Sequence, residues 1–236
     1  MSAFKGSGVL ALWLDVEPGL DRETDAWYVD EHMPERIDIG GYLRARRYQA
    51  LQGAPAYLTL FEASTPDALA SAGYLSLVGR ISEQSRRIRA GFSGVARATL
   101  EVRASAGRGI GGVMASLRLK PRGADRAAAV AALDELAPRL LRRHGVVGVH
   151  WLQPAPQVRA RMDAVRAVGR DDAPVDYALF VEASRAAEIE ALRDISLSAR
   201  AMAELGWDEE SFGVYCLLYE VSGRIAGNET ILGDRT

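Results

Sequence analysis

Residues 27–41 read Trp-Tyr-Val-Asp-Glu-His-Met-Pro-Glu-Arg-Ile-Asp-Ile-Gly-Gly, and the rest of the chain is organised around them. The stretch combines two large aromatic residues, one of only three histidines and a high density of charge. Asp21 can cap a helix that runs to about Met33. Pro34 should disturb that helix, because proline lacks an N–H and clashes with the preceding turn. The Gly-Gly pair then turns the chain into a strand at 42–50.

A regular helical wheel divides this helix into two faces. The apolar face, which we expect to be buried, consists of Ala26, Val29, Met33 and Ile37. A polar strip beside it consists of Asp25, Tyr28, His32 and Arg36. Tyr28 and His32 are four residues apart, so their side chains should touch. Arg36 follows the proline, and its direction therefore depends on how far the helix is disturbed.

The sequence also repeats itself. Residues 8–50 pair with 112–154 at a constant spacing of 104, and 56–64 pair with 176–184 at a spacing of 120. Identical pairs at the first spacing include Asp30/Asp134, Glu31/Glu135 and Pro34/Pro138. Because order and spacing agree, we infer a tandem duplication. The difference of the two spacings, 120 − 104, means that the second half carries 16 extra residues between its two blocks.

Each half is predicted to follow a βαββαβ plan. In the first half we expect strands at 8–16, 42–50, 56–63 and 95–103 and helices at 21–33 and 65–90. In the second half we expect strands at 113–119, 146–152, 176–182 and 212–221 and helices at 125–143 and 185–205. The predicted fold class is α+β, with the two antiparallel sheets packed face to face and helices on their outer faces.

The predicted boundaries are 1–104 for the first half, 105–112 for a linker, 113–222 for the second half and 223–236 for a polar tail. The linker glycines do not match a dinucleotide-binding loop, and they precede a strand instead of following one. The insertion 155–173 carries Val158, Met162 and Val165 at helical spacing, which predicts an amphipathic helix. It either straps a sheet edge, which we expect, or covers a pocket as a lid.

The duplication provides an internal comparison for the polar strip. At the spacing of 104, His32 is replaced by Leu136 and Arg36 by Leu140, and Tyr28 is replaced by an alanine. The pairs Asp30/Asp134, Glu31/Glu135 and Pro34/Pro138 are retained, which favours an architectural role for them. The strip therefore favours a function specific to the first half. The alternative is sequence drift, with His32 as a packing histidine at an interface.

The motif Trp27-x-x-x-Glu31-His32-x-Pro34-Glu35, with the Gly-Gly turn and the arginine-rich strand after it, resembles the EthD-like branch of the dimeric α+β barrel superfamily. The resemblance covers residues 8–103, and in the second half it covers only the fold plan and the shared Asp-Glu-x-x-Pro. It implies tandem ferredoxin-like repeats that form an intramolecular dimeric α+β barrel. Relatives with a single unit homodimerise, and a homodimer of this whole chain remains open.

An imidazole can give or take a proton near neutral pH, so His32 is the predicted general acid–base. Tyr28 is its predicted hydrogen-bond partner, and Arg36 is predicted to hold an anion. Trp27, Trp13 and Arg46 are predicted to contact the substrate, although core filling is the alternative for both tryptophans. This set favours cofactor-independent isomerisation, cyclisation, lyase or monooxygenase chemistry on a small, largely apolar, oxygenated molecule. The alternative is a non-catalytic metabolite-binding or stress-associated module.

A haem-binding protein is a further alternative, since the superfamily includes members that bind haem through a histidine, and His32 would be that ligand. No other cofactor is predicted. No metal site is predicted either, because His144 and His150 belong to the other half and lack metal-ligand spacing.

The net charge of −2 favours neither nucleic acid nor an anionic membrane as a partner, so we expect a small-molecule ligand. Cys216 is the only cysteine and cannot form an internal disulfide, which fits a reducing compartment. The apolar run at 8–14 is too short to span a bilayer and no cleavage site follows it. We therefore expect a cytoplasmic protein.

Overall fold

The computed structural model describes residues 4–165 and 172–223. The first half contains β1 (Gly8–Val16), α1 (Asp21–Trp27), the π-helical turn η1 (Tyr28–His32), α2 (Met33–Asp38), β2 (Tyr42–Gly53), β3 (Tyr57–Ala63), the 3-10 turn η2 (Asp67–Ala70), α3 (Ala72–Val78), α4 (Glu83–Ala90) and β4 (Phe92–Gly107). The second half contains β5 (Val113–Pro121), α5 (Arg126–Leu141), β6 (Val146–Pro154), α6 (Pro156–Ala164), β7 (Ala173–Pro174), β8 (Tyr177–Ala183), α7 (Ala186–Arg193), α8 (Ala199–Glu204) and β9 (Trp207–Ser222). The tail expected at 223–236 lies outside the described residues from 224 onward.

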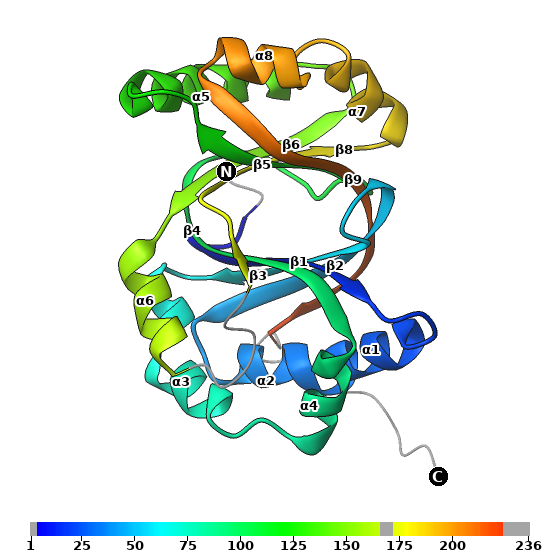
Figure 1. Cartoon of the computed structure of the whole chain (residues 1–236). Helices are drawn as coiled ribbons and strands as arrows, with labels where there is room; N and C mark the ends of the chain where they lie inside the picture. The colour runs from blue at the N-terminus through cyan, green and yellow to red at the C-terminus, as the bar shows by residue number, and fades with distance from the viewer. Residues whose placement is uncertain (1–3, 166–171, 224–236) are drawn as a thin grey trace.

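The strands form one closed antiparallel barrel (Figure 1). Within the first half the strand order is β4-β1-β3-β2, and within the second half it is β9-β5-β8-β6. The halves are joined because β2 pairs with β9 and β4 pairs with β6. The two sheets therefore meet edge to edge and do not merely pack face to face as expected. Each half supplies the partner strands that the other half needs at its two edges.

Helices cover the barrel on two opposite sides. In Figure 1, α1 to α4 cover the sheet of the first half, while α5, α7 and α8 cover that of the second half. Successive residues of β1 point alternately inward and outward, so Val9, Ala11 and Trp13 belong to the barrel interior. Leu10, Leu12 and Leu14 face the helices of the first half. The strand is consequently apolar on both faces from Gly8 to Leu14, as its sequence predicts.

The strand register reveals one extra residue in the first half. Gly8 pairs with Ala63 and Val113 pairs with Ala183, so β1 and β5 are equivalent at a spacing of 105. Tyr42 pairs with Ala63 and Val146 pairs with Ala183, so β2 and β6 are equivalent at a spacing of 104. The first half therefore has one more residue between these strands. The π-helical turn η1 accommodates it, because the N–H of Met33 donates to the carbonyl of Tyr28, five residues back.

This turn makes the predicted core stripe wrong in its first two positions. Met33 and Ile37 are buried, but Ala26 is exposed and Val29 is 42% exposed. Trp27 and Tyr28 occupy the buried face in their place. In a regular helix, the buried position one turn before Met33 would be Val29. The wider π turn moves that buried position one residue earlier in the sequence, to Tyr28. The helix also continues past Pro34 to Asp38, directly after the turn.

The insertion of the second half packs on the first half. Val158 and Met162 of α6 are buried in the core of the first half, while Val165 is 39% exposed. The short strand β7 pairs with β4 at Ala96 and Arg97. The described part of the insertion thus covers a sheet edge, as expected of a strap. Two further long helices of the prediction, at 65–90 and 185–205, are each divided into shorter ones. No helix of the described residues is long and apolar enough to cross a membrane.

Candidate functional site

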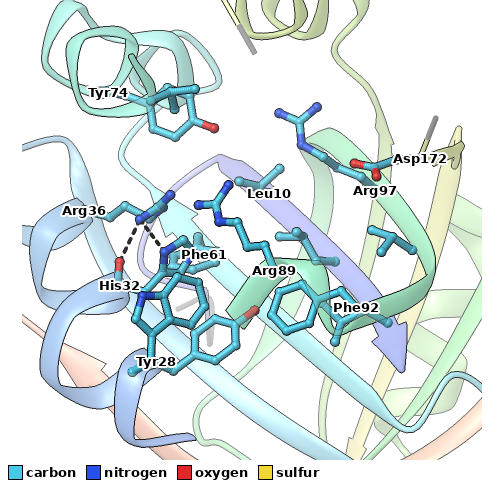
Figure 2. A pocket seen from close by; sticks show the side chains of 15 residues that line it. Leu10, Tyr28, His32, Arg36, Phe61, Tyr74, Arg89, Phe92, Arg97 and Asp172 are labelled. Atoms are coloured by element: carbon cyan, nitrogen blue, oxygen red, sulfur yellow. Dashed lines mark hydrogen bonds between the residues drawn. The ribbon is translucent and has the colours of Figure 1, made fainter. Parts of the chain in front are cut away.

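A cavity of about 250 Å³ lies in the first half between the outer face of the sheet and the covering helices (Figure 2). Its apolar lining comes mainly from strands β1, β3 and β4 and from helix α3. Its polar lining comes from the helical segment that contains η1 and from α4, β4 and the residue before β7. The residues that line it are Leu10, Leu12, Leu14, Trp27, Tyr28, His32, Arg36, Phe61, Tyr74, Val78, Arg89, Phe92, Val95, Arg97 and Asp172.

His32 is the last residue of the π turn, and its ring is fixed on one side by Arg36. The Nη1 of Arg36 lies 3.0 Å from His32 Nδ1 and 2.8 Å from the His32 carbonyl oxygen. A guanidinium can only donate, so Nδ1 must accept and the proton of the neutral ring resides on Nε2. Among the described residues Nε2 has no hydrogen-bond partner. The Nε2–H group is therefore available to a molecule in the cavity.

Aromatic rings hold His32 on its other sides. The Trp27 ring lies 4.1 Å from the imidazole between centroids, and the Tyr28 ring meets it edge-on at 5.1 Å. Phe61 approaches edge-on at 5.8 Å. The predicted contact of Tyr28 with His32 is thus a ring contact. The Tyr28 hydroxyl points toward Phe92 in Figure 2, and the Tyr28 ring lies 4.3 Å from the guanidinium of Arg47.

These surroundings keep the imidazole neutral. Burial is the main cause that holds the pKa of His32 well below its ordinary value of 6.5, and the positive charges of Arg36, Arg89 and Arg47 act in the same direction. A neutral ring with Nδ1 occupied can donate a hydrogen bond but has no free acceptor nitrogen. The site therefore presents a donor to a ligand, together with the charge of the neighbouring guanidinium groups.

Several lining residues were missed in the sequence. Arg97 stands on β4, and its Nη1 lies 2.8 Å from Asp163 of α6. Arg89 of α4 lies over the Trp27 ring, with 5.7 Å between its central carbon and the ring centroid. Asp172 comes from the insertion, next to β7. A usable signal was Arg97 itself, because a lone arginine interrupts the apolar run 95–100 on the face that β4 turns toward the helices.

Two residues predicted to contact substrate lie elsewhere. Trp13 is in the barrel interior, where its Nε1 donates to Ser116 Oγ at 3.0 Å. Arg46 is also inside the barrel, 2.9 Å from Glu62 and 2.8 Å from Glu182. Side chains alternate across a strand, so both residues point away from the face that lines the cavity. Neither belongs to the binding site proposed below, whereas Trp27 lines the cavity together with Tyr28, His32 and Arg36.

The corresponding part of the second half is lined differently, because the hollow of about 320 Å³ beside Leu136 and Leu140 opens between α5 and α8. Leu136 and Leu140 stand where the first half has His32 and Arg36, at a spacing of 104. Trp207 stands where the first half has Phe92, because each follows the glycine that precedes the last strand. These side chains, with Trp151, are buried in the core of the second half. The cavity of the first half is thus lined by His32 and Arg36 where the second half has leucines, so the sequence difference between the halves is a difference in the chemistry of the lining.

One member of each of two retained pairs has an architectural place: Glu31 in the first half and Asp134 in the second. The Glu31 carboxylate accepts hydrogen bonds from Ser82 and Ser85 of the neighbouring helix, at 2.6 Å and 2.9 Å. Trp27 Nε1 donates to the same Ser85 at 3.0 Å. In the second half Asp134 accepts from Trp151 and Arg103. Among the described residues, no group of three or more His, Cys, Asp or Glu side chains is arranged to hold a metal ion.

No protein-family model and no curated protein matches this sequence. Solved structures do match over nearly the whole chain. An anthrone oxidase-like protein has a TM-score of 0.58 at 14% identity, covering 94% of this chain and 95% of its own. A provisionally assigned monooxygenase from Fusobacterium nucleatum has 0.57 at 8%, covering 92% and 95%. A haem-binding protein from Thermus thermophilus has 0.54 at 14%, covering 91% and 92%.

At these identities the likeness concerns the fold. The EthD-like motif remains a resemblance in sequence, while the overall fold agrees with the structural matches over more than nine tenths of the chain. The chain therefore has the fold of a dimeric α+β barrel, with both ferredoxin-like units supplied by one polypeptide.

Proposed function

We propose that the first half binds a small, largely apolar, oxygenated molecule in the cavity beside His32. The observation that supports this most directly is the Arg36 hydrogen bond to Nδ1, which leaves Nε2–H as the donor for a ligand oxygen. The leucine side chains of β1 and the rings of Phe61 and Phe92 provide an apolar wall around that donor. Ligand sites commonly combine such a wall with a few fixed polar groups.

The chemistry that fits best is stabilisation of negative charge on oxygen. A fixed neutral imidazole donor lowers the energy of an enolate or phenolate as it forms, and one such donor can change a rate about 100-fold or more. This role differs from the general acid–base role expected from the sequence, because Nδ1 cannot accept a proton while Arg36 donates to it. Enolisation, cyclisation and cofactor-free oxygenation of a phenolate all develop charge of this kind.

A haem at this site is a poorer match. Ligation of iron through Nε2 would require the proton to move to Nδ1, where it would face an N–H of Arg36 at 3.0 Å. Haem-ligating histidines instead donate from their second nitrogen to an acceptor. The donor set around His32 therefore does not fit an axial haem ligand, and no haem-dependent step follows from it.

The test uses 2-acetylnaphthalene, a neutral aromatic ketone whose oxygen can accept one hydrogen bond. Removing the donor in His32→Ala should weaken binding about ten-fold, which corresponds to about 1.4 kcal/mol. His32→Gln can place an amide N–H near the position of Nε2–H, so it should retain most of the affinity. Titration calorimetry measures both variants, and thermal unfolding shows that each is folded.

Equal affinities of the wild type and the folded His32→Ala variant would contradict the donor role. If His32 acted as a general base, His32→Gln would lose turnover as completely as His32→Ala, because glutamine cannot replace imidazole as a base. Turnover distinguishes the enzyme from a binding module. Mass spectrometry of aryl ketones and phenols incubated with the protein should show conversion by the wild type that His32→Ala lacks, while a binding module would return them unchanged.

A further inference from the structure

Three guanidinium groups from three different elements surround the cavity. Arg36 comes from α2, Arg89 from α4 and Arg97 from β4, and all three line it. Figure 2 shows them on one side of the apolar wall, around the space above Leu10, with the hydroxyl of Tyr74 turned toward the same space. The only carboxylate among the described lining residues is that of Asp172. The lining thus carries an excess of positive charge.

The charge of Arg36 has no carboxylate within close contact among the described residues. Its side chain is 5% exposed, yet its close partners are the neutral ring and the backbone carbonyl of His32. The nearest carboxylate that forms an ion pair with it is Glu35, at 4.0 Å. Arg97 is 3% exposed and has Asp163 at 2.8 Å. Burying a cation without a close anion is unfavourable, so an anionic ligand would stabilise this arrangement.

The remaining lining restricts the shape of that ligand. Leu10, Leu12 and Leu14 form a continuous wall, because alternate residues of a strand share one face. Phe61 and Phe92 extend the wall from β3 and β4. A simple inorganic anion would leave this surface without contacts. A flat apolar body with one anionic end would contact both parts of the cavity.

We propose that the ligand is an aromatic acid, that is, a flat apolar molecule whose ionised oxygen, a carboxylate or an acidic phenolate, lies among Arg36, Arg89 and Arg97. This inference rests on the proposed function and narrows it to one chemical class. The arginines hold the ionised oxygen, as guanidinium groups hold carboxylates. His32 donates from Nε2 to an oxygen of the same molecule.

Matched probe pairs test the charge separately from the shape. Each pair is an aryl carboxylate and the methyl ketone of the same ring system: benzoate with acetophenone, 2-naphthoate with 2-acetylnaphthalene, and 2-anthroate with 2-acetylanthracene. At pH 7.5 and low salt, calorimetry should give at least ten-fold tighter binding for the carboxylate of the pair that fits best. Raising the ionic strength should reduce that preference, since the attraction is electrostatic.

Arginine variants identify the groups responsible. Arg89→Gln and Arg97→Gln should each lower carboxylate affinity about ten-fold while leaving ketone affinity nearly unchanged. Arg86→Gln is the matched control, because Arg86 is exposed on the same helix as Arg89 and does not line the cavity. Two arginine variants are included so that a folding defect in one, detected by thermal unfolding, leaves the other informative.

The two proposals fail in distinguishable ways. Equal affinity for carboxylate and ketone, with ketone binding still reduced in His32→Ala, would overturn the aromatic-acid inference alone. Carboxylate binding that all three arginine variants reduce equally would also overturn it, because the effect would then be one of overall charge. Absence of binding by every pair would overturn both proposals.

Discussion

The two nitrogens of His32 have different surroundings. Nδ1 accepts from Arg36, a partner that cannot reverse its role, and Nε2 is left for the cavity. The hydrogen bond from Arg36 to the His32 carbonyl fixes the same guanidinium to the backbone, so tautomer and ring direction are set together. Fixing a polar group in advance lowers the cost of using it in binding or catalysis. The sequence does not show which nitrogen accepts and which donates, because it shows only that histidine and arginine are four residues apart.

A consequence for stability follows from the lowered pKa of His32. In the unfolded chain a histidine titrates near pH 6.5, while the folded protein resists protonating His32. The unfolded state therefore binds more protons as the pH falls below about 6.5, and unfolding becomes easier. The stabilisation is complete above about pH 6.5 and is lost progressively below it. The free energy of unfolding should fall by at most about 1.4 kcal/mol per pH unit for each proton that the unfolded chain binds in excess.

His32→Gln should flatten this acid-side slope, since glutamine does not titrate. Denaturant unfolding at a series of values between pH 7.5 and pH 5 measures it. His150 is buried in the barrel, and burial lowers its pKa as well, so His150→Gln should change the slope in the same direction as His32→Gln. A slope unaltered by His32→Gln would show that the imidazole is not kept neutral by the fold.

At the scale of the element, the π turn organises the site. It places Trp27 and Tyr28 on the buried face together with His32, five and four residues later. In a regular helix, residues five apart point about 140° away from each other, so Trp27 would not stack on His32. Such turns cost stability and are frequent at functional sites. The helix of the second half, α5, spans the equivalent strands with one residue fewer and has no such turn.

The sequence predicted the position of this helix but not its buried face. The sequence halves align without a gap at a spacing of 104, so the alignment does not show the extra residue. Only the strand pairing of β1 and β5 in the structure shows that these strands are equivalent at a spacing of 105. Met33 and Ile37 were placed correctly, since they follow the turn, whereas Ala26 and Val29 were projected through it as if the helix were regular.

Deleting Val29 should test whether the turn contains a surplus residue. The deletion should convert the segment into a regular helix, with the flanking helices α1 and α2 kept in place and the stability little changed. Deleting the exposed Ala131 from α5 is the matched control, because that helix has no surplus residue. The deletion would rotate one part of α5 relative to the other, so Leu133 and Leu136 would leave the core. That deletion should cost at least about 3 kcal/mol. Thermal and denaturant unfolding measure both.

The Val29 deletion should also weaken aryl ketone binding, because Tyr28 would be displaced relative to His32. Comparable instability of the two deletions would contradict the surplus-residue interpretation. Unchanged ligand affinity in the Val29 deletion would show that the turn does not serve the site.

At the scale of the whole molecule, both halves are needed to complete one site. The cavity is in the first half, but two carboxylates beside it come from the insertion of the second half. Asp163 contacts Arg97, and Asp172 lines the cavity. The sequence predicted the repeat, the succession of strands and helices in each half and the helical spacing of the apolar residues in α6. It did not predict where α6 packs, because long-range docking depends on side chains of both halves, such as Met162 against β4.

Ionised groups inside the barrel also join the halves. Arg46 of the first half lies between Glu62 of its own half and Glu182 of the other, and all three are fully buried. His150 lies 3.3 Å from Glu182, and Phe4 lies against both His150 and Arg46. Burial by itself would raise the pKa of Glu182, but the neighbouring His150 and Arg46 lower it to about 2. Glu182 thus remains a carboxylate in the closed barrel.

Glu182→Gln and Arg46→Met should each destabilise the protein by about 3–5 kcal/mol, because each removes a close ion-pair partner from a buried charge. The double variant should be less destabilised than the sum of the two, since both substitutions remove the same Arg46–Glu182 ion pair. Denaturant unfolding at pH 7.5 measures the four proteins of this cycle. Glu204→Gln, which breaks the exposed pair of Glu204 with Arg200, should change little.

The pH dependence of the same cycle provides a second check with a defined sign. The folded pKa of Glu182 lies below the value of about 4.3 for an unfolded glutamate, so its contribution is complete above about pH 4.3 and is lost as the pH falls toward 2. The difference between wild type and Glu182→Gln should therefore shrink over that acid range. Strictly additive single variants, or a difference that persists at the lowest pH where the wild type still folds, would mean that the halves are held together by strand pairing and apolar packing alone.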